Sequence, residues 1–408
     1  MLNIIWASFF IIPFLFALYQ SFVLGNTQIW TELVSSTFSS SKDAFYICIN
    51  LTGILCLWLG ILKIAENSGI TNLLAKALSP FFTKVMPDVP KNHASIGSIV
   101  MNMAANMLGL DNAATPFGLK AMEQLQDLNK KKDTATNAQI LFMVLNSSGV
   151  TIIPITILMY RSELGSLNPS SVFVPILLAT SVSTLFGFLL VSYVQKLNIF
   201  NRIVMGYLLG IGGLIAFIAC FFANLSPEAR LKYSADIGNF ILFAVIIAFI
   251  ITGLIKKINV YDTFITGAKE GFDVAVRIIP YLVAMLVAIA VLRTSGVLDL
   301  ITLGLEKFIL LFTSNADFVA ALPTAIMKPL SGSGARAMMI ETMQTYGADS
   351  FQGFASSVVQ GSTETTFYVL AVYFGVVRIT KIRHALACSL LADLVGIIAA
   401  IYFAYLFY

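Results

Sequence analysis

Long apolar runs, most of them near the length of a membrane-crossing helix, constrain this chain more than any other feature. About 20 apolar residues span the hydrocarbon core of a bilayer as a helix. The runs cover residues 2–24, 44–64, 138–160, 172–194, 203–223, 237–255, 279–292, 354–377 and 385–407. Lipid requires backbone groups to be satisfied within the segment, and these runs lack the alternation of barrel strands. The sequence therefore predicts an all-α polytopic membrane protein.

The composition excludes a soluble protein and a disordered one. Hydrophobic residues make up 58% of the 408 residues and charged residues only 11%, whereas soluble domains carry about 25% charged residues. A mean hydropathy of +0.87 is too high for a disordered chain. The net charge of +4 is spread over loops and indicates no nucleic-acid partner. The first run lacks a basic start and exceeds the ~7–15 residues of a signal-peptide core, so we expect a transmembrane helix there.

Residues that bind metals or catalyse reactions are sparse. His93 and His384 are far apart, and the four cysteines lie in apolar runs without CxxC spacing, as buried small hydrophobes do. We find no nucleophile with a base, no HExxH and no paired carboxylates at a candidate site. The sequence thus favours a protein that is not an enzyme and has no metal or cofactor, although a coupling cation such as sodium or a proton would be compatible with it.

Five shorter segments have the pattern of helices that do not fully cross the membrane. Residues 71–86, 260–277 and 298–312 mix apolar and charged residues at helical spacing, which is typical of interfacial helices or short spans. Residues 95–109 and 318–330 are apolar but short, and Asn, Pro and Gly interrupt them. We expect half-membrane helices at these two places.

Basic residues predict which loops face the cytoplasm. By the positive-inside tendency, clusters of Lys and Arg mark the cytoplasmic side. These clusters occur at residues 130–132, 196–202, 256–257 and 378–383. The segments that then fall outside are the loop at 161–163, the loop at 226–236 and the tail after residue 407.

The two ends of the chain resemble each other in the same order. The matched segments are 67–78 with 294–305, 110–122 with 331–343, and 146–157 with 360–371. Run 138–160 starts at a basic loop, whereas its counterpart 354–377 ends at one, so the copies are predicted to be inverted in the membrane. Inverted repeats with discontinuous helices are typical of secondary transporters. An old duplication kept only for its structure is the alternative.

The segment QGSTETT places an ionisable residue, Glu364, at the depth of a membrane run. Such a residue costs about 2.5–3.5 kcal/mol on insertion scales and is a functional candidate. Its polar neighbours could satisfy a broken backbone and bind a small polar ligand or cation. The candidate ligand residues here are Gln360, Gly361, Ser362, Thr363, Glu364 and Thr365. The alternative is a helix N-cap, with Ser362 or Thr363 capping and Glu364 in the first turn.

The segment KPLSGSGARAMM combines glycines with positive charge. Glycines let backbone N–H groups approach a ligand closely, and Lys328 and Arg336 suit an anionic or hydrogen-bonding ligand. The candidate residues are Ser331, Gly332, Ser333, Gly334 and Arg336. The alternative is a tight turn in which Arg336 pairs with Glu341 or Glu364.

The matching segments of the first copy are less charged. Asn and Ser side chains there could recognise a polar ligand by hydrogen bonds, or could join helices without any ligand. The candidate residues are Asn102, Asn106, Asp111, Asn112, Asn146, Ser147 and Ser148. Pro154 is expected to perturb the helix that follows.

These motifs resemble a known family. The first half, through IGSIVMNMAANMLGLDNAATPFGLKAMEQLQ and FMVLNSSGVTIIP, resembles spore maturation protein A, and the second, through ALPTAIMKPLSGSGARAMMIETM and VVQGSTETTFYVLAVYFG, resembles spore maturation protein B. Both belong to the nucleoside-recognition, or gate, domain family, which is distantly similar to concentrative nucleoside transporters. The resemblance implies re-entrant hairpins, broken helices and a site lined by residues 361–364.

The sequence and the resemblance together predict two inverted gate-type repeats with re-entrant or broken helices. Residues 1–200 would form the protein A-like repeat, 201–258 linking transmembrane helices, and 259–408 the protein B-like repeat. The expected function is secondary transport of a small polar or anionic solute, such as a nucleoside-like molecule, across the bacterial inner membrane. The alternative is a non-transporting envelope protein that senses a ligand or scaffolds partners. The expected partners are the lipid bilayer and the solute, and a homo-oligomer is compatible with the sequence.

Overall fold

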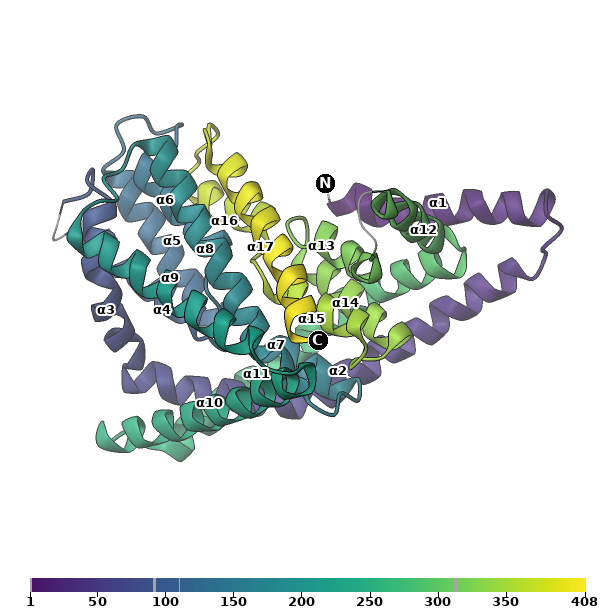
Figure 1. Ribbon diagram of the computed structural model, residues 1–408, viewed down its shortest axis with the longest axis horizontal. Coiled ribbons are helices and arrows are strands. Elements are labelled where there is room, and N and C mark those ends of the chain that lie inside the picture. The colour runs from purple at the N-terminus through teal and green to yellow at the C-terminus, as the bar shows by residue number, and fades with distance from the viewer. Residues whose placement is uncertain (1, 91–92, 110, 312–314) are drawn as a thin grey trace.

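The computed structural model describes residues 2–90, 93–109, 111–311 and 315–408, without the side chains of residues 2 and 111–113. Helices form almost all of this part of the chain, and no strand occurs in it (Figure 1). The elements of the first half are α1 (Leu2–Phe22), α2 (Ile29–Ser68), α3 (Ile70–Val85), α4 (Ala94–Met107), α5 (Asp111–Asp127), α6 (Asn137–Ser147), α7 (Ile155–Glu163), η1 (Pro169–Val172), α8 (Phe173–Gln195) and α9 (Arg202–Ala223). Those of the second half are α10 (Pro227–Ile255), α11 (Val260–Thr294), α12 (Val297–Leu310), η2 (Asp317–Ala321), α13 (Leu322–Met327), α14 (Gly332–Tyr346), α15 (Phe351–Gly361), α16 (Thr366–Val376) and α17 (Ala385–Phe407).

Seven helices of the described chain, namely α1, α2, α8, α9, α10, α11 and α17, are long and apolar enough to cross a membrane. The outer faces of α9 and α10 are rich in exposed large apolar side chains, including Phe217 and Phe243. Contiguous exposed apolar surface of this kind suits lipid rather than water. The protein is thus an all-α polytopic membrane protein, as predicted.

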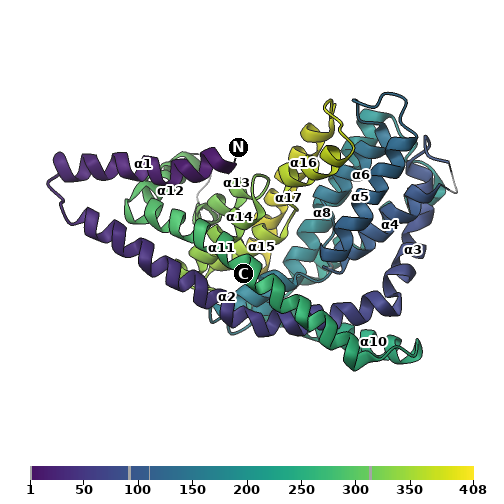
Figure 2. The same cartoon turned by 180° about the vertical axis from the view of Figure 1, so that it is seen from behind.

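The order of the helices shows the repeat. In each copy a long helix (α2 or α11) leads into an amphipathic one (α3 or α12), then a short apolar one (α4, or η2 with α13) and a further helix (α5 or α14). A broken helix (α6 and α7, or α15 and α16) and an uninterrupted span (α8 or α17) complete the copy. Helices α9 and α10 link the copies (Figures 1 and 2).

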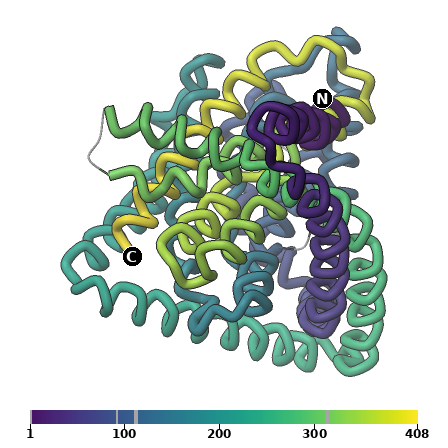
Figure 3. Tube along the Cα trace, turned by 90° about the vertical axis from the view of Figure 1, so that its right-hand side faces the viewer, coloured from purple at the N-terminus to yellow at the C-terminus, as the bar shows by residue number. Residues whose placement is uncertain are grey.

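Helices α2 and α11 lie side by side along much of their length (Figure 3). Glycines make this close approach possible, because a Cβ added at Gly267 would lie 2.4 Å from the Leu59 carbonyl oxygen and one added at Gly271 would lie 2.7 Å from Cys56 Cα. Small residues four apart are a common device for packing helices in membranes. The Lys63 ammonium bridges Glu66 and Glu270 beside this contact.

Four expected segments have different boundaries in the structure. Residues 260–277 and 279–292 are not an interfacial helix and a separate span but one helix, α11, with Pro280 inside it. The runs 138–160 and 354–377 are each interrupted, at residues 148–154 and 362–365. Apolar composition alone could not show these interruptions, because buried irregular backbone and helix carry the same apolar residues.

Most loops gather at two ends of the molecule in the groups that their charges predicted, but the basic residues 256–257 do not. At one end the Asp133 carboxylate pairs with Lys381, and Gln195 contacts His384. At the other, Arg161 pairs with Asp349, and Arg230 donates to the carbonyl of Leu406. The basic end of α10 lies apart from the first group, near the end of α2 (Figures 1 and 2).

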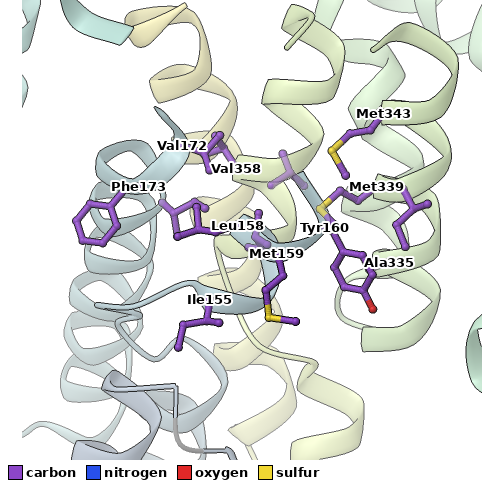
Figure 4. Packing of buried hydrophobic residues seen from close by; sticks show 14 of the residues in the cluster. Ile155, Leu158, Met159, Tyr160, Val172, Phe173, Ala335, Met339, Met343 and Val358 are labelled. Atoms are coloured by element: carbon purple, nitrogen blue, oxygen red, sulfur yellow. The ribbon is translucent and has the colours of Figure 1, made fainter. Parts of the chain in front are cut away.

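Helix α7 packs at the centre of the larger hydrophobic core. Its residues Leu158, Met159 and Tyr160 lie near Met339 of α14 and Val358 of α15 (Figure 4). A helix of the first copy thus fills the space between helices of the second, which holds the two helix breaks in fixed relation.

Candidate functional site

The two helix breaks meet. Helix α6 ends at Ser147 and α15 ends at Gly361, and the irregular segments that follow them pack against each other. The backbone N–H of Glu364 in the second break donates to the Ser147 carbonyl oxygen at 2.8 Å. This bond satisfies one of the carbonyls that a helix end leaves without a partner.

The first break is held by hydrogen bonds from its neighbours. The Ser147 hydroxyl donates to Ser389 of α17 at 3.0 Å, and the Thr151 N–H donates to Thr180 of α8 at 3.3 Å. The Ile152 N–H donates to the Met107 carbonyl at 2.9 Å, and the Thr184 hydroxyl donates to the Ser148 carbonyl.

The second break keeps unpaired polar groups. The Ser362 hydroxyl donates back to the Val359 carbonyl at 2.8 Å, but Gln360 Oε1, Thr363 Oγ1 and Thr366 Oγ1 have no hydrogen-bond partner although they are buried. The interpretation of this segment as a simple N-cap is wrong, because α16 begins only at Thr366 and no side chain caps it. Glu364 precedes that helix and is exposed.

Two cavities adjoin the crossing. The smaller, of about 110 Å³, is lined by Asn106, Lys328, Gln360, Gly361 and Thr363, among others. The larger, of about 830 Å³, is lined by Thr115, Asn146, Ser331, Gly332, Ser333 and Thr365, among others. Arg336 and Glu364 line both cavities. A guanidinium and a carboxylate therefore both lie where the two cavities adjoin.

The start of α14 forms the wall opposite the second break. Ser331 caps the helix by accepting from the Gly334 N–H at 3.1 Å. A Cβ added at Gly332 would lie 2.7 Å from Thr365 Oγ1, so any larger residue here would force the Thr365 hydroxyl to move. The motif therefore brings backbone close to the second break.

Arg336 has no acidic partner within 4.0 Å in the described part of the chain. Its guanidinium lies 5.8 Å from the centre of the Tyr160 ring, and its Nε has no hydrogen-bond partner. The expected pairing with Glu341 is wrong, because Glu341 accepts from Arg293 at 3.0 Å. The pairing with Glu364 is absent as well.

The candidate residues of the first copy serve different purposes. Asn106 and Asn146 line the cavities, and Asn146 also donates to Asn102 at 2.6 Å. Asn102, Ser147 and Ser148 are buried and line neither cavity, so they join helices as the ligand-free alternative proposed. The side chains of Asp111 and Asn112 lie outside the described residues, although their backbone begins α5.

The sequence-based candidates omitted Asp393, which lies in the middle of α17 and is 2% exposed. Neither of its carboxylate oxygens has a hydrogen-bond partner. A single acid inside the apolar run 385–407 was a signal for it, because intramembrane acids are expensive and mark function. No group of three or more His, Cys, Asp and Glu side chains that could hold a metal occurs in the part of the chain that the structure describes.

Comparisons with known proteins agree with this architecture. A family model described as nucleoside recognition (Gate) matches residues 48–167 and 275–380, which together contain both helix breaks. Spore maturation protein A of Bacillus subtilis (strain 168) is 39% identical over 183 residues, which are 45% of this chain and 90% of that protein. Spore maturation protein B of the same organism is 46% identical over 157 residues, 38% of this chain and 86% of that protein, and the two cover different parts of the chain. No solved structure matches the chain.

Proposed function

The chain belongs to the nucleoside-recognition (Gate) family, and we propose on that basis that it is a secondary transporter of a small polar or anionic solute. The membrane is the bacterial inner membrane in this proposal. The observation that supports it most is that two cavities adjoin at Arg336 and Glu364, where two broken helices cross.

The chemistry of the crossing suits a polar solute with an acidic or strongly hydrogen-bonding group. Arg336 offers a guanidinium whose Nε is unpaired, and Gln360 offers an unpaired carbonyl oxygen. Glu364 would accept hydrogen bonds from hydroxyl or amino groups on the same solute. Helix α16 also begins beside Glu364 and points its N-terminus towards the crossing, which favours anionic groups.

The repeat suits alternating access. Transporters built from inverted repeats place their binding site near the middle of the membrane, between discontinuous helices, and move one repeat against the other. Here each copy contributes one broken helix to the crossing. The two cavities share Arg336 and Glu364 in their lining. In this proposal the solute enters through one cavity, binds at these two residues and leaves through the other.

The test is uptake into vesicles that contain the purified full chain. The panel comprises radiolabelled nucleosides, nucleobases and small organic acids, each with and without a sodium gradient. The proposal expects uptake of at least one solute, lost in Glu364→Gln and kept in Glu123→Gln, a matched change at an exposed residue of α5. Uptake that survives Glu364→Gln would refute the role of Glu364. Binding without uptake would instead favour a ligand sensor.

A further inference from the structure

Helices α8 and α17 are matched partners across the repeat. A Cβ added at Gly187 of α8 would lie 3.1 Å from Ala392 Cβ, and one added at Gly396 of α17 would lie 2.9 Å from Ser183 Cβ. Gly187 and Gly396 differ by 209 residues, and so do Ser183 and Ala392, so the two contacts join equivalent positions of the two helices. By this correspondence Thr180 matches Ser389, and both accept a hydrogen bond from a residue of the first break.

The same correspondence matches Thr184 with Asp393. In the first copy, the Thr184 hydroxyl donates to the carbonyl of Ser148, the C-cap residue of α6. In the second copy, the C-cap residue of α15 is Ser362. A carboxylate at the matched position cannot donate to a carbonyl, because an ionised acid is only an acceptor. An ionised Asp393 therefore could not replace the hydrogen bond that Thr184 gives to the end of α6 in the first copy.

Asp393 is surrounded by further oxygen atoms that lack partners. Thr366 is fully buried and lies close enough to interact with the carboxylate, yet its hydroxyl forms no hydrogen bond of normal geometry. Thr363 is 3% exposed, its Oγ1 is unpaired, and its methyl group would lie 2.8 Å from a Cβ at Gly396, one turn beyond Asp393. Thr366 thus lies beside Asp393, and Thr363 lies against α17 one turn further along, both behind the second break.

The charged residues that act on Asp393 are Lys328, which attracts it, and Glu364, which repels it. Neither forms a hydrogen bond with its oxygens. A buried charge is stable only when paired or bound to a cation. A proton would occupy one oxygen, whereas three oxygen-bearing groups without partners suit a hard cation that takes several oxygen ligands. The C-terminal end of α15 adds the negative end of a helix dipole.

We propose that Asp393, Thr363 and Thr366 form a sodium-binding site behind the second helix break. The carboxylate and the two hydroxyls are its side-chain ligands, and carbonyls at the end of α15 complete it, as unwound backbone does in other membrane sites. Asp393 and Thr366 line neither of the two cavities, and Thr363 alone touches the smaller one. The proposed site therefore uses neither Glu364 nor Arg336, and it does not require that the protein transports a solute.

The experiment measures thermal unfolding of the purified full chain in detergent, in sodium chloride and in choline chloride of equal ionic strength. We expect sodium to raise the unfolding temperature of the wild type by roughly 3 °C or more at saturation. This rise should disappear in Asp393→Asn and shrink in Thr366→Val. It should remain in Asp273→Asn, a matched change at an exposed residue of α11.

A second variant keeps the test decisive if the first variant does not fold. If Asp393→Asn is unstable, Asp393→Thr supplies the residue of the first copy and should fold without responding to sodium. Binding of radioactive sodium should be lost in the same variants. An unfolding temperature of the wild type that ignores sodium and changes only with pH would overturn the proposal, as would an equal sodium response in Asp393→Asn.

The result is independent of the solute test. Glu364→Gln is expected to keep the sodium response while losing solute uptake. A sodium response without any uptake would leave this site standing and remove the transporter proposal, whereas uptake without a sodium response would do the reverse.

Discussion

The two helix breaks are built from the same plan and differ in what they leave unsatisfied. In the first break, Ser147, Ser148, Thr151 and Ile152 all have hydrogen-bond partners in neighbouring helices or loops. In the second, the crossing keeps unpaired groups on Gln360 and Thr363, and Glu364 faces the cavities. One copy therefore holds the architecture together while the other carries most of the chemistry for a ligand.

This division explains why the charged motifs occur in one half of the sequence only. Two duplicated halves can both contribute to the stability of the fold in the same way. A binding site, however, needs polar groups without partners in the protein, and such groups are costly to bury. Restricting them to one copy limits this cost. The fully paired first break then provides a rigid surface for the second, through the bond from the Glu364 N–H to the Ser147 carbonyl.

The largest expected effect compares matched positions of the two copies. The repeat alignment places Thr115 opposite Arg336, and both line the larger cavity. Arg336→Gln should weaken binding of the transported solute by about 30-fold or more, which is about 2 kcal/mol, because a charged hydrogen bond is lost. Thr115→Ala should weaken it by less than about 3-fold. Titration calorimetry with the solute found by uptake measures both, and equal losses would break the comparison.

The next effect concerns the link between the copies at the predicted outer end. Arg161 of α7 is fully buried and donates to the Ala348 carbonyl at 2.7 Å and to Asp349 at 2.9 Å, both in the loop before α15. Arg161→Met should lower the free energy of unfolding by about 2–3 kcal/mol, because charged hydrogen bonds are lost while Asp349 remains partly hydrated. Unfolding in detergent measures it, with exposed Arg277→Met as the control. An unchanged transition would show that the copies are joined elsewhere.

Glycines at the two breaks give a smaller difference. A Cβ at Gly361 would lie 2.8 Å from Ile157 Cδ1 and from Ile176 Cγ1, whereas one at Gly149 would lie 3.3 Å from the Asn146 carbonyl oxygen. We expect Gly361→Ala to lower the free energy of unfolding by about 1–2 kcal/mol through overpacking, and Gly149→Ala to lower it by less than about 1 kcal/mol. Thermal unfolding of both variants tests this ranking, and the reverse order would contradict it.

The smallest effect is at the basic end of the molecule, where loops of the two copies also meet. The hydrogen bond from Lys381, assisted by Thr134, lowers the pKa of Asp133, and Asp133 in turn raises the pKa of Lys381. The stabilisation by Asp133 is therefore present at neutral pH and lost as pH falls through its lowered pKa, while that by Lys381 is lost as pH rises through its raised pKa. Both groups are exposed, so Asp133→Asn should lower the unfolding temperature by about 1 °C or less at pH 7.

That small difference should shrink as pH falls below about 4, the ordinary pKa of an aspartate, and should vanish below the lowered pKa of Asp133, where the carboxylate is protonated in both folded and unfolded chains. Unfolding temperatures of wild type and Asp133→Asn across this range measure it. A difference that grows as pH falls would mean that Asp133 acts through another partner. A loss as large as that of Arg161→Met would show that both ends join the copies equally.

The sequence predicted the elements that depend on local composition. The spans, the short apolar helix of residues 94–107 and most of the grouping of loops at two ends follow from hydropathy and charge, which act over a few residues. The repeat was visible because matched motifs occur in the same order. The position of the breaks within runs 138–160 and 354–377 was less visible, because Pro154 and the polar segment at 360–366 were compatible with a perturbed helix, a cap or an interruption.

Only the tertiary structure decided which polar residues face a ligand and which join helices. Four residues of the first copy are all small polar residues within apolar segments, namely Asn102, Asn146, Ser147 and Ser148. Of these, Asn146 lines a cavity and the others do not. Asp393 lies about 30 residues after Glu364, and only the packing of α17 against the second break brings it near that residue. The physical reason is that composition fixes what can enter a membrane, whereas the pairing of each polar group depends on helices that are distant in the sequence.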